Sequence, residues 1–91
     1  MHTIVGGSIV GIRILLNIMN IKEKFGNKVK SLREQKGISI EHLANISDVD
    51  RNYISDIEKG KRNVSIEIIE KIINAFDTDF ATFFNDKSFK K

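Results

Sequence analysis

The stretch that decides the fold runs from residue 40 to residue 63 and reads IEHLANISDVDRNYISDIEKGKRN. Its apolar residues recur at the spacing of two short helices joined by a tight turn. Four residues are placed to pack these helices together: Ala44, Val49, Ile54 and Ile57. The second helix then exposes polar side chains at its start, namely Arg51, Asn52, Tyr53 and Ser55. Side chains of this size and polarity read base edges in a major groove, so the stretch predicts sequence-specific DNA binding.

The composition of the 91-residue chain limits what kind of protein it is. With 41% hydrophobic and 30% charged residues, it is typical of one folded domain, too small to enclose a buried catalytic cavity. The absence of cysteine excludes a disulfide framework and a thiolate metal site, and it fits a reducing cytosol. The two histidines, His2 and His42, lie far apart, so we expect no metal and no cofactor.

The basic residues are clustered, although the net charge is only +3. Residues 22–36 hold six Lys or Arg against two Glu, and further basic residues follow at Lys59, Lys61 and Arg62. Such clusters suit contacts with phosphates, but a solvated helix face gives the same pattern. The charge pattern alone leaves both interpretations open.

Capping residues and apolar stripes predict five helices between residues 20 and 84. Asn20 begins the first, with Glu23 three residues later as in a capping box, and Gly37 ends it. Ser39 begins the second, which runs to about residue 46 with an inner face of Leu43, Ala44 and Ile46. Asp48 falls at a turn position that needs a left-handed backbone, which aspartate tolerates better than most residues.

Capping residues and apolar stripes also predict the last three helices. Asp50 begins the third, which ends at Gly60, and Ser65 begins the fourth. The apolar face of the fourth helix consists of Ile66, Ile69, Ile72, Ile73 and Phe76. A short fifth helix covers residues 78–84, and the tail, residues 85–91, has no pattern, so we expect it to be frayed.

Residues 1–19 form an apolar N-terminal extension that differs from the rest of the chain. Its apolar run is too short to span a bilayer comfortably, is interrupted by Arg13 and Asn17, and lacks the features of a secretory signal. We therefore expect a cytoplasmic protein that does not enter a membrane. Helical spacing allows a short helix from about Ser8 that packs on the domain or on a partner subunit. Alternatively, Met19 is the natural start, and the sequence leaves both possibilities open.

A long motif across the second and third helices resembles a known family. It reads Gly37-x-Ser39-x-Glu41-x-Leu43-Ala44, then Asp50-Arg51-Asn52-Tyr53-Ile54-Ser55-x-Ile57-Glu58-x-Gly60-x-Arg62-Asn63. This pattern resembles the phage-repressor and Cro type of helix-turn-helix. The string DRNYISDIEKGKRNVS is most similar to the controller proteins of restriction–modification systems, whose five-helix plan and phenylalanine-rich last helix match residues 20–84.

The resemblance implies an all-α, five-helix domain that forms a symmetric dimer through its fourth and fifth helices. Two third helices would then enter successive major grooves, and the protein would regulate transcription of its own operon. In this family, position 40 is usually a glutamine that bonds a phosphate, and Ile40 cannot do so. We expect Ser39 and the backbone amides of the helix start to take over that contact.

Three residues of the third helix are candidates for reading bases. Arg51 can present two donors to guanine, although it could instead be a surface arginine paired with Asp48 or Asp50. Asn52 can bond adenine or be an ordinary polar surface residue. Tyr53 can contact a thymine methyl group or a phosphate, or be a half-buried packing residue.

Other residues are candidates for contacts with phosphates and with a second subunit. The phosphate candidates are Ser39, Ser55, Arg62, Asn63 and Lys36. A carboxylate facing DNA would repel it, so we expect Glu58 to pair with Arg33 or Arg51. Phe76, Phe80, Phe83 and Phe84 are expected to be buried partly within the monomer and partly at the dimer contact.

The sequence therefore predicts a homodimeric regulator that binds a short palindrome in double-stranded DNA and controls a restriction–modification operon, with RNA polymerase as a further candidate partner. The alternatives are a phage immunity repressor, an antitoxin-type regulator, or a protein-interaction module of the same fold. We expect no enzyme activity, since the sequence shows neither a nucleophile constellation nor a phosphate-binding glycine loop.

Overall fold

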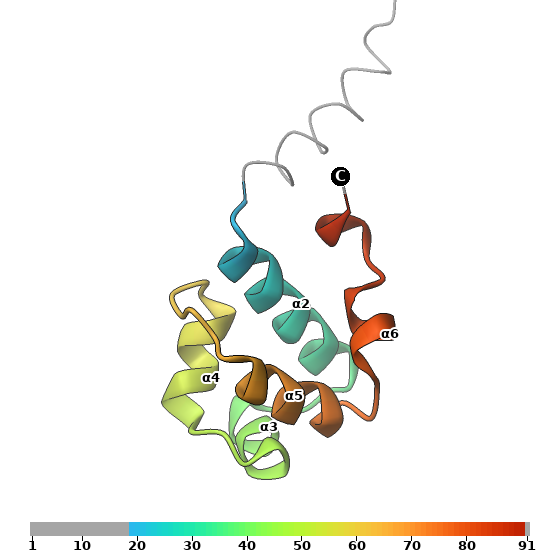
Figure 1. The fold of residues 1–91 in the computed structure, drawn as a ribbon. Coiled ribbons are helices and arrows are strands. Elements are labelled where there is room, and N and C mark those ends of the chain that lie inside the picture. Colours follow the sequence, from blue (N-terminus) through green and yellow to red (C-terminus); the bar gives the residue numbers. More distant parts are fainter. Residues whose placement is uncertain (1–18, 91) are drawn as a thin grey trace, which may run out of the picture.

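This computed structural model describes residues 19–90, which contain five α-helices and one short 3₁₀ helix (Figure 1). They are α2 (Ile21–Gln35), α3 (Ile40–Ser47), α4 (Arg51–Glu58), α5 (Ile66–Ala75), α6 (Phe80–Phe84) and the 3₁₀ helix η1 (Lys87–Phe89). The predicted all-α, five-helix architecture is confirmed. The helix expected from about residue 8 lies outside the described residues. None of the helices between residues 19 and 90 is both long and apolar enough to cross a bilayer.

The helices begin where side chains can satisfy their free backbone amides. Asn20 accepts a hydrogen bond from the Glu23 amide at 2.9 Å, and the Glu23 carboxylate accepts one from the Asn20 amide at 3.0 Å, which completes the predicted capping box. Ser39 and Ser65 cap α3 and α5 as predicted, while α6 begins later than expected because Asp79 caps it. Local chemistry therefore fixes the helix starts.

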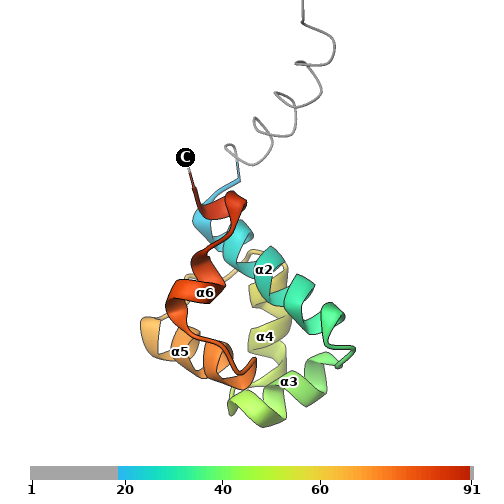
Figure 2. The ribbon, with the colours of Figure 1, turned by 90° about the vertical axis from the view of Figure 1, so that its right-hand side faces the viewer.

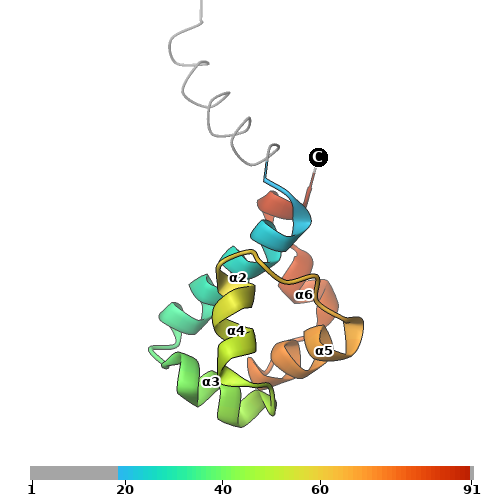
Figure 3. The same ribbon diagram turned by 90° about the vertical axis from the view of Figure 1, so that its left-hand side faces the viewer.

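The core joins all the helices around α2. Every α-helix contributes at least one buried residue to it, and the buried members are Phe25, Val29, Leu43, Val49, Ile54, Ile57, Ile72, Ile73, Phe76 and Phe83. Helix α4 packs against α2 and α3, and α5 packs against α3 and α6. Two views from opposite directions show α6 with η1 facing the viewer in Figure 2 and α4 facing the viewer in Figure 3, so they lie on opposite sides of the molecule.

Two isoleucines expected on core faces lie at the surface instead. Ile46 is 49% exposed, because α3 turns Leu43 and Ser47, which are four residues apart, toward the core. The Ser47 hydroxyl is satisfied there by donating a hydrogen bond to the Leu43 carbonyl at 2.6 Å. Ile66 is 72% exposed, and its neighbours Ser65 and Glu67 at the start of α5 are exposed as well.

The prediction of a frayed tail is wrong for residues 85–90. The Asp86 carboxylate accepts hydrogen bonds from the backbone amide and the hydroxyl of Ser88, both at 2.9 Å, and pairs with the Lys28 ammonium of α2 at 3.0 Å. The Phe89 ring packs edge-on against the Phe84 ring, with centroids 4.9 Å apart. These contacts dock η1 on α2 and α6, and the hydrogen bond from the Ser88 amide is the main cause that lowers the pKa of Asp86.

Candidate nucleic-acid interface

The outer face of α4 carries polar side chains that stand clear of the protein. Asp50 caps the helix by accepting hydrogen bonds from the amides of Asn52 and Tyr53, at 2.8 and 3.1 Å. Arg51 and Asn52 are exposed, and Ser55 is half-buried on the same helix. Ile54 and Ile57 are almost completely buried on the opposite face, with 0% and 1% exposure. Helix α4 is therefore anchored by its inner face and free to contact a partner with its outer one.

The turn before α4 has the conformation that the sequence predicted. Asp48 adopts φ 57° and ψ 42°, in the left-handed region. Val49 follows it, 6% exposed, with its amide bonded to the Ala44 carbonyl at 3.2 Å. The buried valine and the left-handed aspartate together fix the angle between α3 and α4.

Gly26, a residue that sequence analysis did not single out, lets α2 and α4 touch through their backbones. A Cβ at this position would lie 2.0 Å from the Ile57 carbonyl oxygen and 3.1 Å from its carbon. Only glycine leaves room for this approach. A glycine inside a helix costs about 1 kcal/mol of stability relative to alanine. Its presence in the middle of an otherwise regular helical pattern was the feature of the sequence that could have indicated a packing role.

A nearly buried ion pair ties α4 to α2. The Arg33 Nε donates to Glu58 Oε2 at 2.7 Å and Nη2 donates to Oε1 at 3.0 Å, while Nη1 donates to the Ile38 carbonyl at 2.9 Å. The side chains of Arg33 and Glu58 are only 14% and 6% exposed. The hydrogen bond to Glu58 raises the pKa of the Arg33 guanidinium. Of the two partners expected for Glu58, the structure selects Arg33, which is thereby withdrawn from any contact with phosphate.

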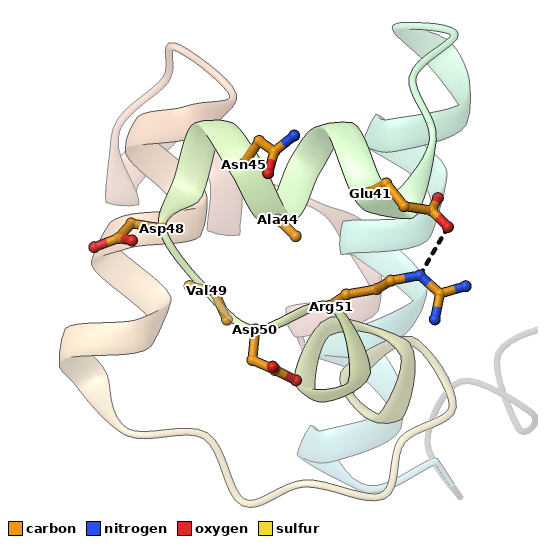
Figure 4. A pocket seen from close by; sticks show the side chains of 7 residues that line it. All are labelled: Glu41, Ala44, Asn45, Asp48, Val49, Asp50 and Arg51. Carbon is orange, nitrogen blue, oxygen red and sulfur yellow. Dashed lines mark hydrogen bonds and ion pairs between the residues drawn. The ribbon is translucent and has the colours of Figure 1, made fainter.

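Arg51 pairs with a carboxylate that the sequence did not indicate. Its Nε donates to Glu41 Oε2 of α3 at 2.7 Å, and neither Asp48 nor Asp50 is its partner (Figure 4). The two terminal nitrogens of Arg51 point away from Glu41 (Figure 4). An open hollow of about 390 Å³ lies between α3 and α4, and it is lined by Glu41, Ala44, Asn45, Asp48, Val49, Asp50 and Arg51. With three carboxylates in its lining, this hollow does not favour a phosphate.

The loop after α4 is held against the helix by Arg62. The Arg62 guanidinium carbon lies 4.7 Å from the centre of the Tyr53 ring, and Nε lies 3.3 Å from Asp56 Oδ2. This stacking accounts for the half-buried Tyr53, in agreement with the packing interpretation of that residue. Arg62 and Asn63 themselves are exposed. The structure thus brings Tyr53 and Arg62 together beside α4.

The remaining phosphate candidates lie where α2 meets α3. Lys36 is exposed at the end of α2, and Ser39 is exposed at the start of α3, where it accepts a hydrogen bond from the His42 amide at 3.0 Å. Ile40 is half-buried against the core and has no polar group to offer. A contact with phosphate at this helix start would use backbone amides and Ser39.

The four phenylalanines proposed for the dimer contact do not share one environment. Phe76 and Phe83 are only 2% and 1% exposed in the monomer, because they fill the core between α2, α5 and α6. They have almost no surface left for a second subunit, which corrects the expectation for these two. Phe80, 38% exposed, and the half-buried Phe84 keep accessible surface, and their ring centroids are 6.3 Å apart.

Known proteins are similar to this chain in sequence and in fold. The HTH_3 family, described as helix-turn-helix, matches residues 29–83. Control protein C.MunI of a Mycoplasma species is 46% identical over 68 residues, which cover 74% of this chain and 92% of C.MunI. The restriction–modification controller protein C.AhdI from Aeromonas hydrophila matches with a TM-score of 0.66 and 41% identity, over 69% of this chain and 96% of C.AhdI.

A third match contains DNA. C.Esp1396I, in a structure bound to a 25 base pair operator site, matches with a TM-score of 0.68 and 35% identity, over 72% of this chain and 87% of that one. Sequence and structure therefore lead to the same group of proteins. The chain belongs to the HTH_3 helix-turn-helix family of transcription regulators, and it is similar to the controller proteins of restriction–modification systems.

Proposed function

We propose that this protein is a non-enzymatic transcriptional regulator that binds a short palindromic operator in double-stranded DNA as a homodimer and controls a restriction–modification operon. The observation that carries the proposal is the outer face of α4. Arg51 and Asn52 are exposed there, on a helix whose inner face is buried and whose backbone touches α2 at Gly26. The similarity to controller proteins, one of them bound to operator DNA, supports the same conclusion.

Sequence discrimination would come from the first turn of α4. An arginine can donate two hydrogen bonds to guanine and an asparagine can bond adenine bidentately, each worth about 1–3 kcal/mol of discrimination against the wrong base. We assign these roles to Arg51 and Asn52. Tyr53 keeps a lesser role in reading bases, since its ring already supports Arg62.

Most of the affinity would come from contacts with phosphates and would therefore depend on salt. The candidates are Ser39, Ser55, Arg62, Asn63 and Lys36. Ser55 lies on α4 itself, and the other four lie in the segments before and after it, at the junction of α2 and α3 and in the loop after residue 60. This arrangement matches a helix that lies in a groove with a phosphate strand on either side.

A palindromic operator requires a twofold dimer. Two half-sites separated by one turn of DNA, about 34 Å, would match two α4 helices related by symmetry. Phe80 and Phe84 are the proposed apolar contact between subunits. The regulator would act in the cytoplasm, where it could also contact RNA polymerase bound beside the operator.

Selection of bound sequences from a random duplex pool tests this function. We expect one enriched palindrome, and we expect Arg51→Ala to lose the preference for it while keeping salt-sensitive binding to random DNA. Lys87→Ala is a matched control, because it removes one positive charge from η1 on the opposite side of the molecule (Figures 2 and 3). Wild-type protein that enriches no sequence at physiological salt would contradict the proposal and favour a protein-interaction module of the same fold.

A further inference from the structure

The position of the Arg51 guanidinium depends on Glu41. Both side chains are largely exposed, at 58% and 57%, so core packing does not immobilise either of them. Among the residues that the structure describes, Glu41 is the hydrogen-bond partner of Arg51, through Nε and Oε2 at 2.7 Å. An arginine side chain has many rotamers, and one charge-assisted hydrogen bond restricts them.

The bond to Glu41 occupies one edge of the guanidinium and leaves the other available. Arginine has five N–H donors in a planar fork, and Nε–H provides only one of them. The terminal nitrogens point away from Glu41 (Figure 4), and together they can span the O6 and N7 acceptors of guanine. The ion pair is therefore compatible with base contact and does not have to break first.

The place of Glu41 in α3 keeps its carboxylate charged. It lies in the first turn of that helix, where the unpaired backbone amides favour a negative charge. The hydrogen bond from Arg51, followed by one from its own backbone amide, lowers the pKa of Glu41. The Glu41 carboxylate also competes with phosphates for the Arg51 guanidinium, because it already holds the Nε edge.

We propose that Glu41 is a positioning residue for sequence recognition: it holds the Nε edge of Arg51 so that the terminal nitrogens face a base, and it keeps the guanidinium off neighbouring phosphates. Both effects favour the operator over random DNA. This inference rests on the proposed function, because it assumes that α4 enters a major groove. Glu41 would thus contribute to sequence specificity without having to touch DNA.

The experiment measures affinity for the selected operator and for random duplex at several salt concentrations. We expect Glu41→Ala to lower the ratio of the two affinities about tenfold, the effect of losing roughly 1.4 kcal/mol of discrimination. Glu41→Gln keeps an oxygen that can accept from Nε, so it should recover part of the ratio. Glu67→Ala is the matched control, since it removes an exposed carboxylate from the first turn of α5.

A double-variant comparison shows whether Glu41 acts through Arg51. In an Arg51→Ala background, Glu41→Ala should leave the affinity ratio unchanged, because the side chain that it positions is gone. In the free protein, the NMR signal of the Arg51 Nε proton should shift in Glu41→Ala and stay unchanged in Glu67→Ala.

Two results would overturn the inference while leaving the proposed function intact. In one, Glu41→Ala changes both affinities by the same factor, as expected if only a general repulsion were removed. In the other, it lowers the ratio equally with and without Arg51, so that it acts by another route. Wild-type protein with no preference for any duplex would instead refute the proposed function and this inference together.

Discussion

Breaking the ion pair between Arg33 and Glu58 is expected to destabilise the domain strongly. Glu58→Gln keeps the size of the side chain and one acceptor oxygen but leaves the Arg33 cation without a counter-charge at a site where both side chains are mostly buried. Removing one partner of a buried pair typically costs about 3–5 kcal/mol. We expect the lower end, about 3 kcal/mol, because the amide oxygen can still accept one hydrogen bond.

That loss is large for a domain of this size. Small domains have roughly 5–15 kcal/mol of stability in total, and 1 kcal/mol shifts the melting temperature by about 4–8 °C when 60–100 residues fold together. Glu58→Gln should therefore lower the melting temperature by roughly 12–24 °C. Thermal and urea unfolding followed by circular dichroism measure this directly.

Two further variants separate the ion pair from general effects of charge. Glu34→Gln removes the same charge from an exposed position of α2 and should change stability little. The double variant Arg33→Met with Glu58→Leu replaces both charges with apolar groups and should recover much of the loss. If Glu58→Gln unfolds at the same temperature as Glu34→Gln, the buried pair does not stabilise the fold and this reasoning is refuted.

Three other changes test separate parts of the structure. Gly26→Ala should lower the free energy of unfolding by about 1–3 kcal/mol, although alanine has the better helix propensity, because the new Cβ overlaps the Ile57 carbonyl. Urea unfolding measures this, and an unchanged midpoint of the urea transition would contradict the close contact. Asp50→Ala should lower the free energy of unfolding by about 1 kcal/mol in the same assay, because α4 loses its N-cap. Asn27→Ala, a substitution of an exposed residue within α2, is the control, and an equal loss of stability there would argue against a capping role for Asp50. The pKa of Asp86 is lowered in the folded state, so its contribution is present above the unfolded pKa and disappears as the pH falls below about 4. Thermal unfolding of Asp86→Asn should then lose less stability on acidification than wild type, and parallel pH curves would disprove this linkage.

The sequence predicts the features that depend on neighbours along the chain. Asn20, Ser39, Asp50 and Ser65 cap helices where expected, because each cap uses an amide two or three residues away. The left-handed Asp48 follows from the same local reasoning. Such features require no knowledge of how the helices are arranged.

Features set by the rotation and distance between helices were missed. The partner of Arg51 is ten residues away across the turn, and only the crossing of α3 and α4 selects Glu41 over the nearer carboxylates. The exposure of Ile46 depends on how α3 is rotated about its own axis. The docking of Phe89 requires the chain to return to α2 and α6, which no local pattern in the tail indicates.

The contact at Gly26 also affects how the protein could acquire new DNA targets. The backbones of α2 and α4 meet there, so the orientation of α4 depends on Gly26 and not on the outward side chains of α4. Under the proposed function, exchanging the outward side chains at positions 51 and 52 would leave this contact in place, so the orientation of the helix would stay the same while the preferred bases change. The domain is thus suited to retargeting, because substitutions on the outer face of α4 can change its specificity without changing the fold.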